Sequence, residues 1–211
     1  MPEGLTKQEV DKGIDPSVSK QYDDSVSSEE KFEDMYKIVD GLKIGMMGTL
    51  RNGIGPVHRA MAVSKRTGPD FLFLSNAHSQ KFDDIESNKI ISIAFHDKIN
   101  QDWVSVTGEM ATSSADDPRI KEIYSKAVKV WFGDLGDGVH DGGPNDPRMK
   151  LIEVKSKFIS YWKHEAGALG YGAEIASALV TGKVAQTGTL RQMKEDEIAK
   201  MRSKHSSMSS S

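Results

Sequence analysis

Short apolar runs follow one another closely along the chain, and this spacing limits the possible folds more than any other feature of the sequence. A doubly wound parallel sheet needs a long helix between successive strands, whereas no long helix separates the first five of these runs. The spacing therefore predicts a mainly β, α+β fold: an antiparallel six-stranded barrel with flanking helices. The six expected strands are 44–50, 57–64, 71–74, 90–95, 103–112 and 149–163.

Two amphipathic helices are expected beside this barrel. A capping box at Ser27–Glu30 begins the first, which stops near Gly41. Its Met and aromatic residues recur at helical spacing and indicate contact with a core rather than with a ligand. Asp117 caps and Pro118 opens the second helix, whose apolar stripe runs to Trp131 and can close one side of the barrel.

The composition changes at both ends of the predicted barrel domain, which we place at 28–165. Residues 1–27 contain few large apolar groups, so they cannot offset the entropy of ordering and are expected to form a flexible arm. Residues 166–211 are expected to form a C-terminal extension with short helices, including a charged helix near 190–202, and a disordered Ser-rich tail.

The overall composition excludes several classes of function. The 211 residues include no cysteine, which removes disulfides, thiolate metal sites and cysteine nucleophiles. The formal net charge is only −3, so no large basic field indicates a nucleic-acid partner. No apolar run could span a bilayer, and the N-terminus has no apolar signal core. We therefore expect a soluble cytoplasmic protein without a membrane partner.

Motifs narrow the chemistry further. No Gly-x-Gly-x-x-Gly follows a strand, and neither a P-loop nor Gly-x-Ser-x-Gly is present. The six histidines lack metal-ligand spacing, and the loop 132–147, rich in Gly and Asp, does not match the helix–loop–helix calcium pattern, so no metal site is expected. Asp83 and Asp84 are adjacent, but neighbours on a helix diverge, which argues against a paired acid and base. The sequence names no catalytic residue.

Polar groups gather where the third apolar run ends. Ser75, Ser79, Gln80 and Lys81 place hydroxyls and a cation on a turn that precedes a short helix. Hydroxyls and a lysine at such a turn suit a phosphate group. The alternative is a polar loop with a serine cap and a solvated lysine, because Ser and Asn favour caps in any case.

Arg59 stands out in the second expected strand. Side chains alternate along a strand, so Arg59 shares one face with Val57, Met61 and Val63. On these residues alone, Arg59 is interpreted as a rim residue that lies over apolar surface.

Four stretches, in this order and spacing, resemble the FMN-binding split barrel of the pyridoxamine 5′-phosphate oxidase type, most closely its general-stress and fungal blue-light-inducible branch. They are Gly-Pro-Val-His-Arg-Ala-Met-Ala-Val-Ser at 55–64, Leu-Phe-Leu-Ser-Asn-Ala-His-Ser-Gln-Lys at 72–81, Trp-Val-Ser-Val-Thr-Gly at 103–108 and Tyr-Trp at 161–162. The resemblance covers about 30–165 and implies a split barrel that binds FMN.

The resemblance also implies roles for particular residues. Arg59 matches the arginine that opens the second-strand motif, Ser75 matches the strand-end Ser/Thr, and Lys81 becomes the first choice of phosphate ligand. Trp103 takes the place of a ring-contacting glutamine, and Trp162 matches the aromatic that reaches the flavin of the partner subunit, which implies a homodimer with the flavin at its interface. The implied cofactor-binding set is His58, Arg59, Ala60, Met61, Ser64, Leu74, Ser75, Ser79, Gln80, Lys81, Trp103 and Trp162.

Departures from the oxidase pattern bear on the activity. The oxidase has a lysine at the position of Ser64, and it has an Arg-x-His that does not follow Trp162 here, so vitamin B6 oxidation is not expected. Two classes of function remain: a stress- or light-responsive flavin-dependent oxidoreductase with an unknown small substrate, and a flavin-binding stress protein without turnover.

Overall fold

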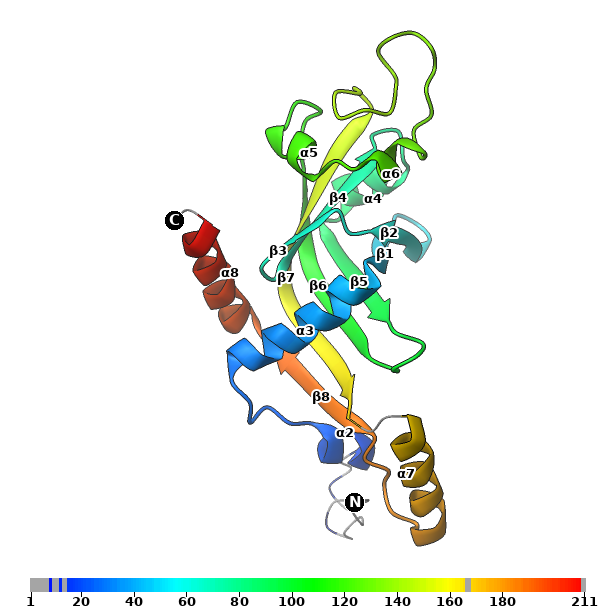
Figure 1. The fold of residues 1–211 in the computed structure, drawn as a ribbon, viewed down its shortest axis with the longest axis vertical. Helices are drawn as coiled ribbons and strands as arrows, with labels where there is room; N and C mark the ends of the chain where they lie inside the picture. The colour runs from blue at the N-terminus through cyan, green and yellow to red at the C-terminus, as the bar shows by residue number, and fades with distance from the viewer. Residues whose placement is uncertain (1–7, 9–11, 13–14, 166–167, 210–211) are drawn as a thin grey trace. The chain divides into compact units, whose positions relative to one another are not determined.

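The computed structural model describes residues 8, 12, 15–165 and 168–209 (Figure 1). These residues belong to two compact units. The first unit comprises 1–42, 95–104 and 160–193, and the second comprises 43–94, 105–159 and 194–211. The expected domain 28–165 does not coincide with either of these two units, and its boundaries stay a prediction.

The strands form one sheet with the order β2-β1-β5-β6-β7-β4-β3, and β8 pairs with β7. The pairs β1–β2, β1–β5, β3–β4 and β4–β7 are antiparallel, so the predicted antiparallel α+β fold is confirmed. The sheet has eight strands rather than six, and no described pairing closes it. The strands are β1 (Ile44–Arg51), β2 (Gly55–Ala62), β3 (Lys65–Thr67), β4 (Asp70–Asn76), β5 (Ile90–His96), β6 (Trp103–Thr112), β7 (Met149–His164) and β8 (Gly188–Met193).

The hairpin β1–β2 belongs to the second unit and has little space between its strands at one position. Gly48 pairs with His58 on β2 and with Ser92 on β5. A Cβ atom at Gly48 would lie 2.6 Å from both His58 Nε2 and Ser92 Oγ, so any other residue there would require these two side chains to move. Helix α4 (Lys81–Ser87) contacts the same β1 strand.

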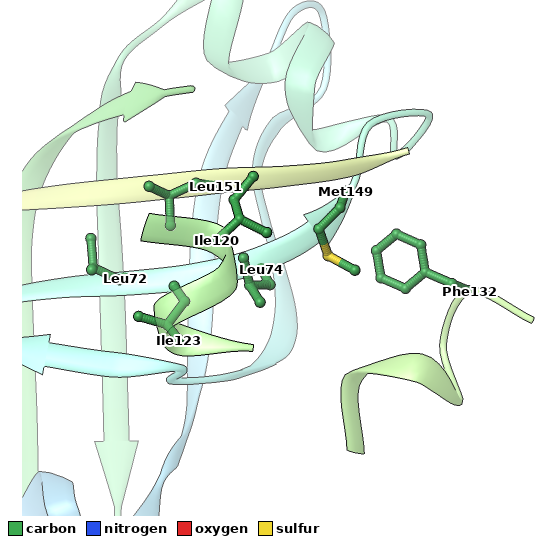
Figure 2. Packing of buried hydrophobic residues seen from close by; sticks show 7 residues of the cluster. All are labelled: Leu72, Leu74, Ile120, Ile123, Phe132, Met149 and Leu151. Atoms are coloured by element: carbon green, nitrogen blue, oxygen red, sulfur yellow. The ribbon is translucent and has the colours of Figure 1, made fainter. Parts of the chain in front are cut away.

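One end of the second unit is filled by an apolar cluster (Figure 2). Strands β4 and β7 contribute to it, and helix α5 (Pro118–Ile123) packs on them. As expected, Asp117 caps this helix, since its Oδ1 accepts a hydrogen bond of 2.9 Å from the backbone N–H of Arg119. The members of the cluster are Leu72, Leu74, Ile120, Ile123, Phe132, Met149 and Leu151.

The predicted helix 118–131 is interrupted. Tyr124 has an extended backbone, and its hydroxyl donates a hydrogen bond of 3.1 Å to Gly142 O, which ends α5. A second short helix, α6 (Lys126–Lys129), follows. Trp131, placed on the buried stripe by the sequence pattern, lies in a turn after the end of α6 and is 82% exposed, because no helix carries it onto that stripe.

Helix α8 (Glu195–Ser209) fastens to the start of β4 in the second unit. Arg202 Nη2 donates to Asp70 Oδ1 at 2.9 Å and to Ser156 O at 2.8 Å. The backbone N–H of Ser156 donates to the same Asp70 oxygen at 2.9 Å. This helix starts later than the predicted helix near 190–202 and extends to Ser209, into the tail that we expected to be disordered.

The first unit contains helices α2 (Pro16–Gln21), α3 (Ser28–Leu42) and α7 (Ala168–Thr181). Helix α3 confirms the helix predicted from the capping box, although it ends at Leu42. Of the predicted flexible arm 1–27, residues 1–7, 9–11 and 13–14 lie outside the described residues. None of the described helices combines the length and apolar character needed to cross a membrane.

Strand β8 corrects the sequence prediction, which began a charged helix near residue 190, inside this strand. Its side chains alternate in burial, which places Arg191 among buried neighbours. Asp34 on α3 accepts hydrogen bonds of 2.8 Å from both Arg191 Nη1 and Lys163 Nζ. A buried carboxylate from a distant segment therefore stabilises a charged residue that looked incompatible with a buried strand face.

Candidate anion-binding site

The side chain of Lys81 is buried at the point where β4 passes into α4. It is only 8% exposed, and its Nζ donates to Ser75 Oγ at 2.7 Å and to Ser79 Oγ at 2.6 Å. Local hydrogen bonds shape this turn: Asn76 Oδ1 accepts from the backbone N–H of His78 at 2.9 Å. The structure thus brings together three of the four residues that the sequence proposed as a phosphate cradle, and Lys81 is not the solvated cation of the alternative.

The ammonium group of Lys81 has an unfavourable environment. Burial and, to a smaller extent, the charge of Arg59 together lower its pKa from 10.5 to about 8. Its hydrogen-bond acceptors are serine hydroxyls, and within the described part of the chain it forms no ion pair with a carboxylate. A buried cation without a countercharge favours the binding of an anion.

Arg59 is held by a buried polar network rather than by an apolar surface. Its Nη2 donates to Asp84 Oδ2 at 3.2 Å, and its Nη1 donates to Thr49 Oγ1 at 2.6 Å. Thr49 Oγ1 in turn donates to Asp84 Oδ2 at 2.7 Å. The interpretation of Arg59 as a rim residue is therefore wrong.

Asp84 anchors this network from the buried side of α4. Its side chain is 3% exposed, while its neighbour Asp83 is exposed, so the two carboxylates diverge as predicted. Arg51 Nε donates to Asp84 Oδ1 at 3.0 Å. The hydrogen bond from Arg51 is the main cause that lowers the pKa of Asp84, and the bonds from Thr49 and Arg59 act in the same direction. Asp84 is therefore ionised at neutral pH.

The other predicted site residues of β2 and β4 have varied surroundings. Met61 shares the half-buried face of β2 with Arg59, whereas His58 and Ala60 are exposed. Ser64 Oγ accepts a hydrogen bond of 3.2 Å from the backbone N–H of Leu74, which is buried. Gln80 is exposed beside Lys81. The surroundings of these residues do not test whether they bind a cofactor, so their assignment to the site stays a prediction.

The two predicted tryptophans belong to the first unit. Trp103 begins β6, and Trp162 lies near the end of β7; both are half-buried. A Cβ atom at Gly188 would lie 2.7 Å from Trp162 Cε2, so β8 packs closely against this indole. The predicted contacts of both tryptophans with a flavin stay a prediction.

Four residues near the site were missed by the sequence reading. Thr49 and Arg51 lie two residues apart on β1, the strand that pairs with the Arg59 strand β2, so they share one face of the sheet. This period of two was a usable signal. Asp84 gave no local signal. Lys150 pairs with Ser75 across β4 and β7, and its Nζ lies 4.7 Å from the ring centroid of Phe82, the residue after Lys81.

Two surface hollows lie outside this cluster. One, of about 560 Å³, is lined by residues 50–55 with Ser87 and Asn88, and it reaches the network only at Arg51. The other, of about 240 Å³, is lined by residues such as Asp117, Arg119 and Glu153. Neither is lined by Lys81, so the charge arrangement rather than the shape of the surface identifies the candidate site.

Comparisons with known proteins agree with this fold. The family model described as "Pyridoxamine 5'-phosphate oxidase like" matches residues 30–186. Protein bli-3 of Neurospora crassa is 36% identical over 197 residues, which cover 92% of this chain and 94% of that protein.

Two solved structures share the fold at lower identity. A Clostridium acetobutylicum protein related to general stress protein 26 has a TM-score of 0.59 at 15% identity, with 82% of this chain and 99% of that chain covered. A general stress FMN/FAD binding protein from Xanthomonas citri has a TM-score of 0.55 at 18% identity, with 66% and 92% covered. The family match over most of the chain, the relative in Neurospora crassa and the antiparallel fold lead to one conclusion: the chain belongs to the pyridoxamine 5′-phosphate oxidase-like family.

Proposed function

We propose that the protein is an FMN-binding flavoprotein and that the site at Lys81 holds the phosphate of the cofactor. The buried ammonium of Lys81, which contacts two hydroxyls and no carboxylate among the described residues, carries this proposal. The relatives support it, since one of the solved structures with this fold is described as FMN/FAD binding.

The residues present fit a phosphate group. Lys81 provides a point cation, and Ser75 and Ser79 provide hydroxyls that can donate hydrogen bonds to phosphate oxygens. Arg59 adds a guanidinium whose charge already acts on Lys81. Charge-assisted hydrogen bonds of this kind are shorter and stronger than neutral ones.

The charge of the cluster supports FMN rather than FAD. Arg51 and Arg59 bind the carboxylate of Asp84, and the charge of Arg59 acts on Lys81, so these four groups together carry a net charge of +2. FMN ends in a phosphate monoester that carries about two negative charges on one phosphate near neutral pH, whereas FAD spreads two charges over the two phosphates of its diphosphate bridge. The monoester therefore brings more charge to a single phosphate position.

A homodimer with the flavin at the subunit interface is part of the proposal. Strands β1 and β5 in the second unit expose large apolar side chains, among them Ile44, Met46 and Ile90. A two-fold partner would cover such a surface with the same surface of its own. In this arrangement the flavin ring lies between the 59–64 segment of one subunit and the partner subunit's Trp162.

The proposed activity is electron transfer between a reduced nicotinamide, or another donor, and an unknown small acceptor in the cytoplasm. When bound, the flavin supplies the redox chemistry, and the residues of this chain bind and orient it. The general stress names of relatives support a role in a stress response, and the resemblance to the blue-light-inducible branch extends it to light. Flavin binding without turnover is the alternative outcome.

The test is a titration of flavin fluorescence with wild-type protein and with Lys81→Ala. Loss of a charge-assisted bond of roughly 1.5–3 kcal/mol weakens binding about tenfold or more, so Lys81→Ala is expected to lose that much affinity for FMN and to keep its affinity for riboflavin. Lys89→Ala, which removes an exposed lysine just after α4, is the matched control and should bind FMN as the wild type does.

Two results of this titration contradict the proposal. Equal FMN affinities of Lys81→Ala and wild type would remove Lys81 from the site, and a preference for riboflavin over FMN would exclude the phosphate cradle. Anaerobic addition of NADPH or NADH to the flavin-loaded protein then separates the two classes of function: bleaching of the visible flavin band indicates an oxidoreductase, and no bleaching with either donor contradicts nicotinamide-dependent turnover.

A further inference from the structure

Asp84 places a carboxylate next to the cations of the candidate site, where it should oppose the binding of any anion. We infer that Asp84 is a positioning residue, which fixes the guanidinium of Arg59 for the anion and so strengthens binding despite its own negative charge. This inference rests on the proposed function, because the anion is taken to be the phosphate of the flavin.

The geometry couples Asp84 to Arg59 through two routes. The direct route is the hydrogen bond of 3.2 Å from Arg59 Nη2 to Asp84 Oδ2. The indirect route passes through Thr49, whose hydroxyl accepts from Arg59 Nη1 at 2.6 Å and donates to the same Asp84 oxygen at 2.7 Å. Both terminal nitrogens of Arg59 thus donate hydrogen bonds to this network, which fixes the plane and the direction of its guanidinium.

Arg51 neutralises the negative charge of Asp84. It donates from Nε to Asp84 Oδ1 at 3.0 Å and from Nη2 to Asp84 Oδ2 at 3.3 Å, and the second of these oxygens also accepts from Arg59. Arg51 therefore offsets the charge of Asp84, and the charge of Arg59 is left for the ligand.

The charges of Arg59 and Lys81 act on each other. The charge of Arg59 opposes protonation of the Lys81 ammonium, which donates to Ser75 and Ser79 and lies 5.8 Å from the centroid of the Phe82 ring. Two cations that repel each other inside one site are stabilised together when an anion binds between them.

The direction of the change in FMN affinity in Asp84→Asn distinguishes a positioning role of Asp84 from a purely electrostatic one. Asp84→Asn removes a negative charge near an anion site, so charge alone predicts tighter FMN binding. Positioning predicts the reverse: FMN affinity falls about tenfold, as expected for a lost charge-assisted bond, while riboflavin affinity stays unchanged. Asp83→Asn is the matched control, because it makes the same substitution on the exposed side of α4 and should not weaken FMN binding.

A double-mutant cycle shows whether Asp84 acts through Arg59. In an Arg59→Ala background, Asp84→Asn should no longer weaken FMN binding, since the residue that it positions is gone. Equal losses with and without Arg59 would overturn the inference. If Asp84→Asn does not fold, Thr49→Val breaks the indirect route with all charges retained; it should weaken FMN binding several-fold, with Thr49→Ser as the variant that restores it.

A titration without flavin tests the positioning independently. The pKa of Lys81, measured by ¹³C NMR of its ε-carbon, should rise in Arg59→Ala and also in Asp84→Asn, because the guanidinium moves away in both. A fall in Asp84→Asn would mean that Arg59 stays in place and would overturn the inference. If the wild type binds no flavin, the proposed function is wrong, while this titration still decides whether Asp84 positions Arg59.

Discussion

The buried ammonium of Lys81 should destabilise the flavin-free protein, and the size of this effect follows from its pKa. Burial lowers the pKa from 10.5 to about 8. One pKa unit corresponds to about 1.4 kcal/mol, so the charged form costs about 3 kcal/mol in the folded state. The folded protein binds fewer protons than the unfolded chain between these two values, so stability rises with pH in that window; below pH 8 the cost is fully present.

Replacement of Lys81 by methionine removes this cost but leaves Ser75 and Ser79 without a donor. Each lost hydrogen bond subtracts about 1 kcal/mol, so Lys81→Met should be about 1–2 kcal/mol more stable than the wild type at pH 7. Near pH 10.5 the wild-type lysine is neutral in the folded protein and half protonated in the unfolded chain, so almost all of the cost is removed and the order should reverse by a similar amount. The difference between the two proteins therefore changes by about 3 kcal/mol between these pH values.

Urea unfolding of the flavin-free proteins at pH 7 and near pH 10.5 measures this change. Other titrating groups contribute equally to both proteins and cancel in the difference. Lys89→Met, at an exposed lysine, should show no comparable change with pH. A difference between Lys81→Met and wild type that stays constant across the two pH values would refute the reasoning, because it would mean that burial does not oppose the charge of Lys81.

Three further predictions concern activity, assembly and stability. Pyridoxamine 5′-phosphate should not be converted to the aldehyde at about 1 per second or faster, because Ser64 stands where the oxidase has a lysine; an assay for aldehyde formation decides this. Mixed dimers of Lys81→Ala and Trp162→Ala subunits should regain tight flavin binding in a fluorescence titration, since one of their two sites is intact; verified mixed dimers without recovery would exclude a shared site. Gly188→Ala should lower stability by about 1–3 kcal/mol in urea unfolding, since its Cβ would lie 2.4 Å from Lys163 O and 2.7 Å from the indole of Trp162; unchanged stability would mean that β8 can move away.

The elements that could be predicted from the sequence are those with a local pattern. Helix α3 has a capping box and an amphipathic stripe, and the β1–β2 hairpin has a turn with Gly53 at a positive φ of 73°. Strand β8 was not predicted, because the buried Arg191 is compensated by Asp34, which lies 157 residues earlier. The break at Tyr124 was missed for a similar reason, since its hydroxyl bonds to a distant loop.

The candidate site shows the same division between local and distant information. Ser75, Ser79 and Lys81 are close in sequence, and their contacts were predictable from one turn. Arg59 was misinterpreted without the resemblance, because its partner Asp84 is 25 residues away on a helix and looks in the sequence like one of two solvated carboxylates. A pairing of this kind is specified by the tertiary fold rather than by any local pattern.

The bond between Arg202 and Asp70 bears on the order of folding. The two residues are 132 positions apart, so Arg202 is synthesised on the order of ten seconds after Asp70 at ribosomal rates of roughly 5–20 residues per second. In the last part of that interval, after His164 has been added, the carboxylate of Asp70 belongs to a nascent chain that contains β4 and β7 but not the guanidinium that completes their contact. The β4 and β7 pairing can therefore form before α8, and docking of α8 is the step that completes this part of the fold.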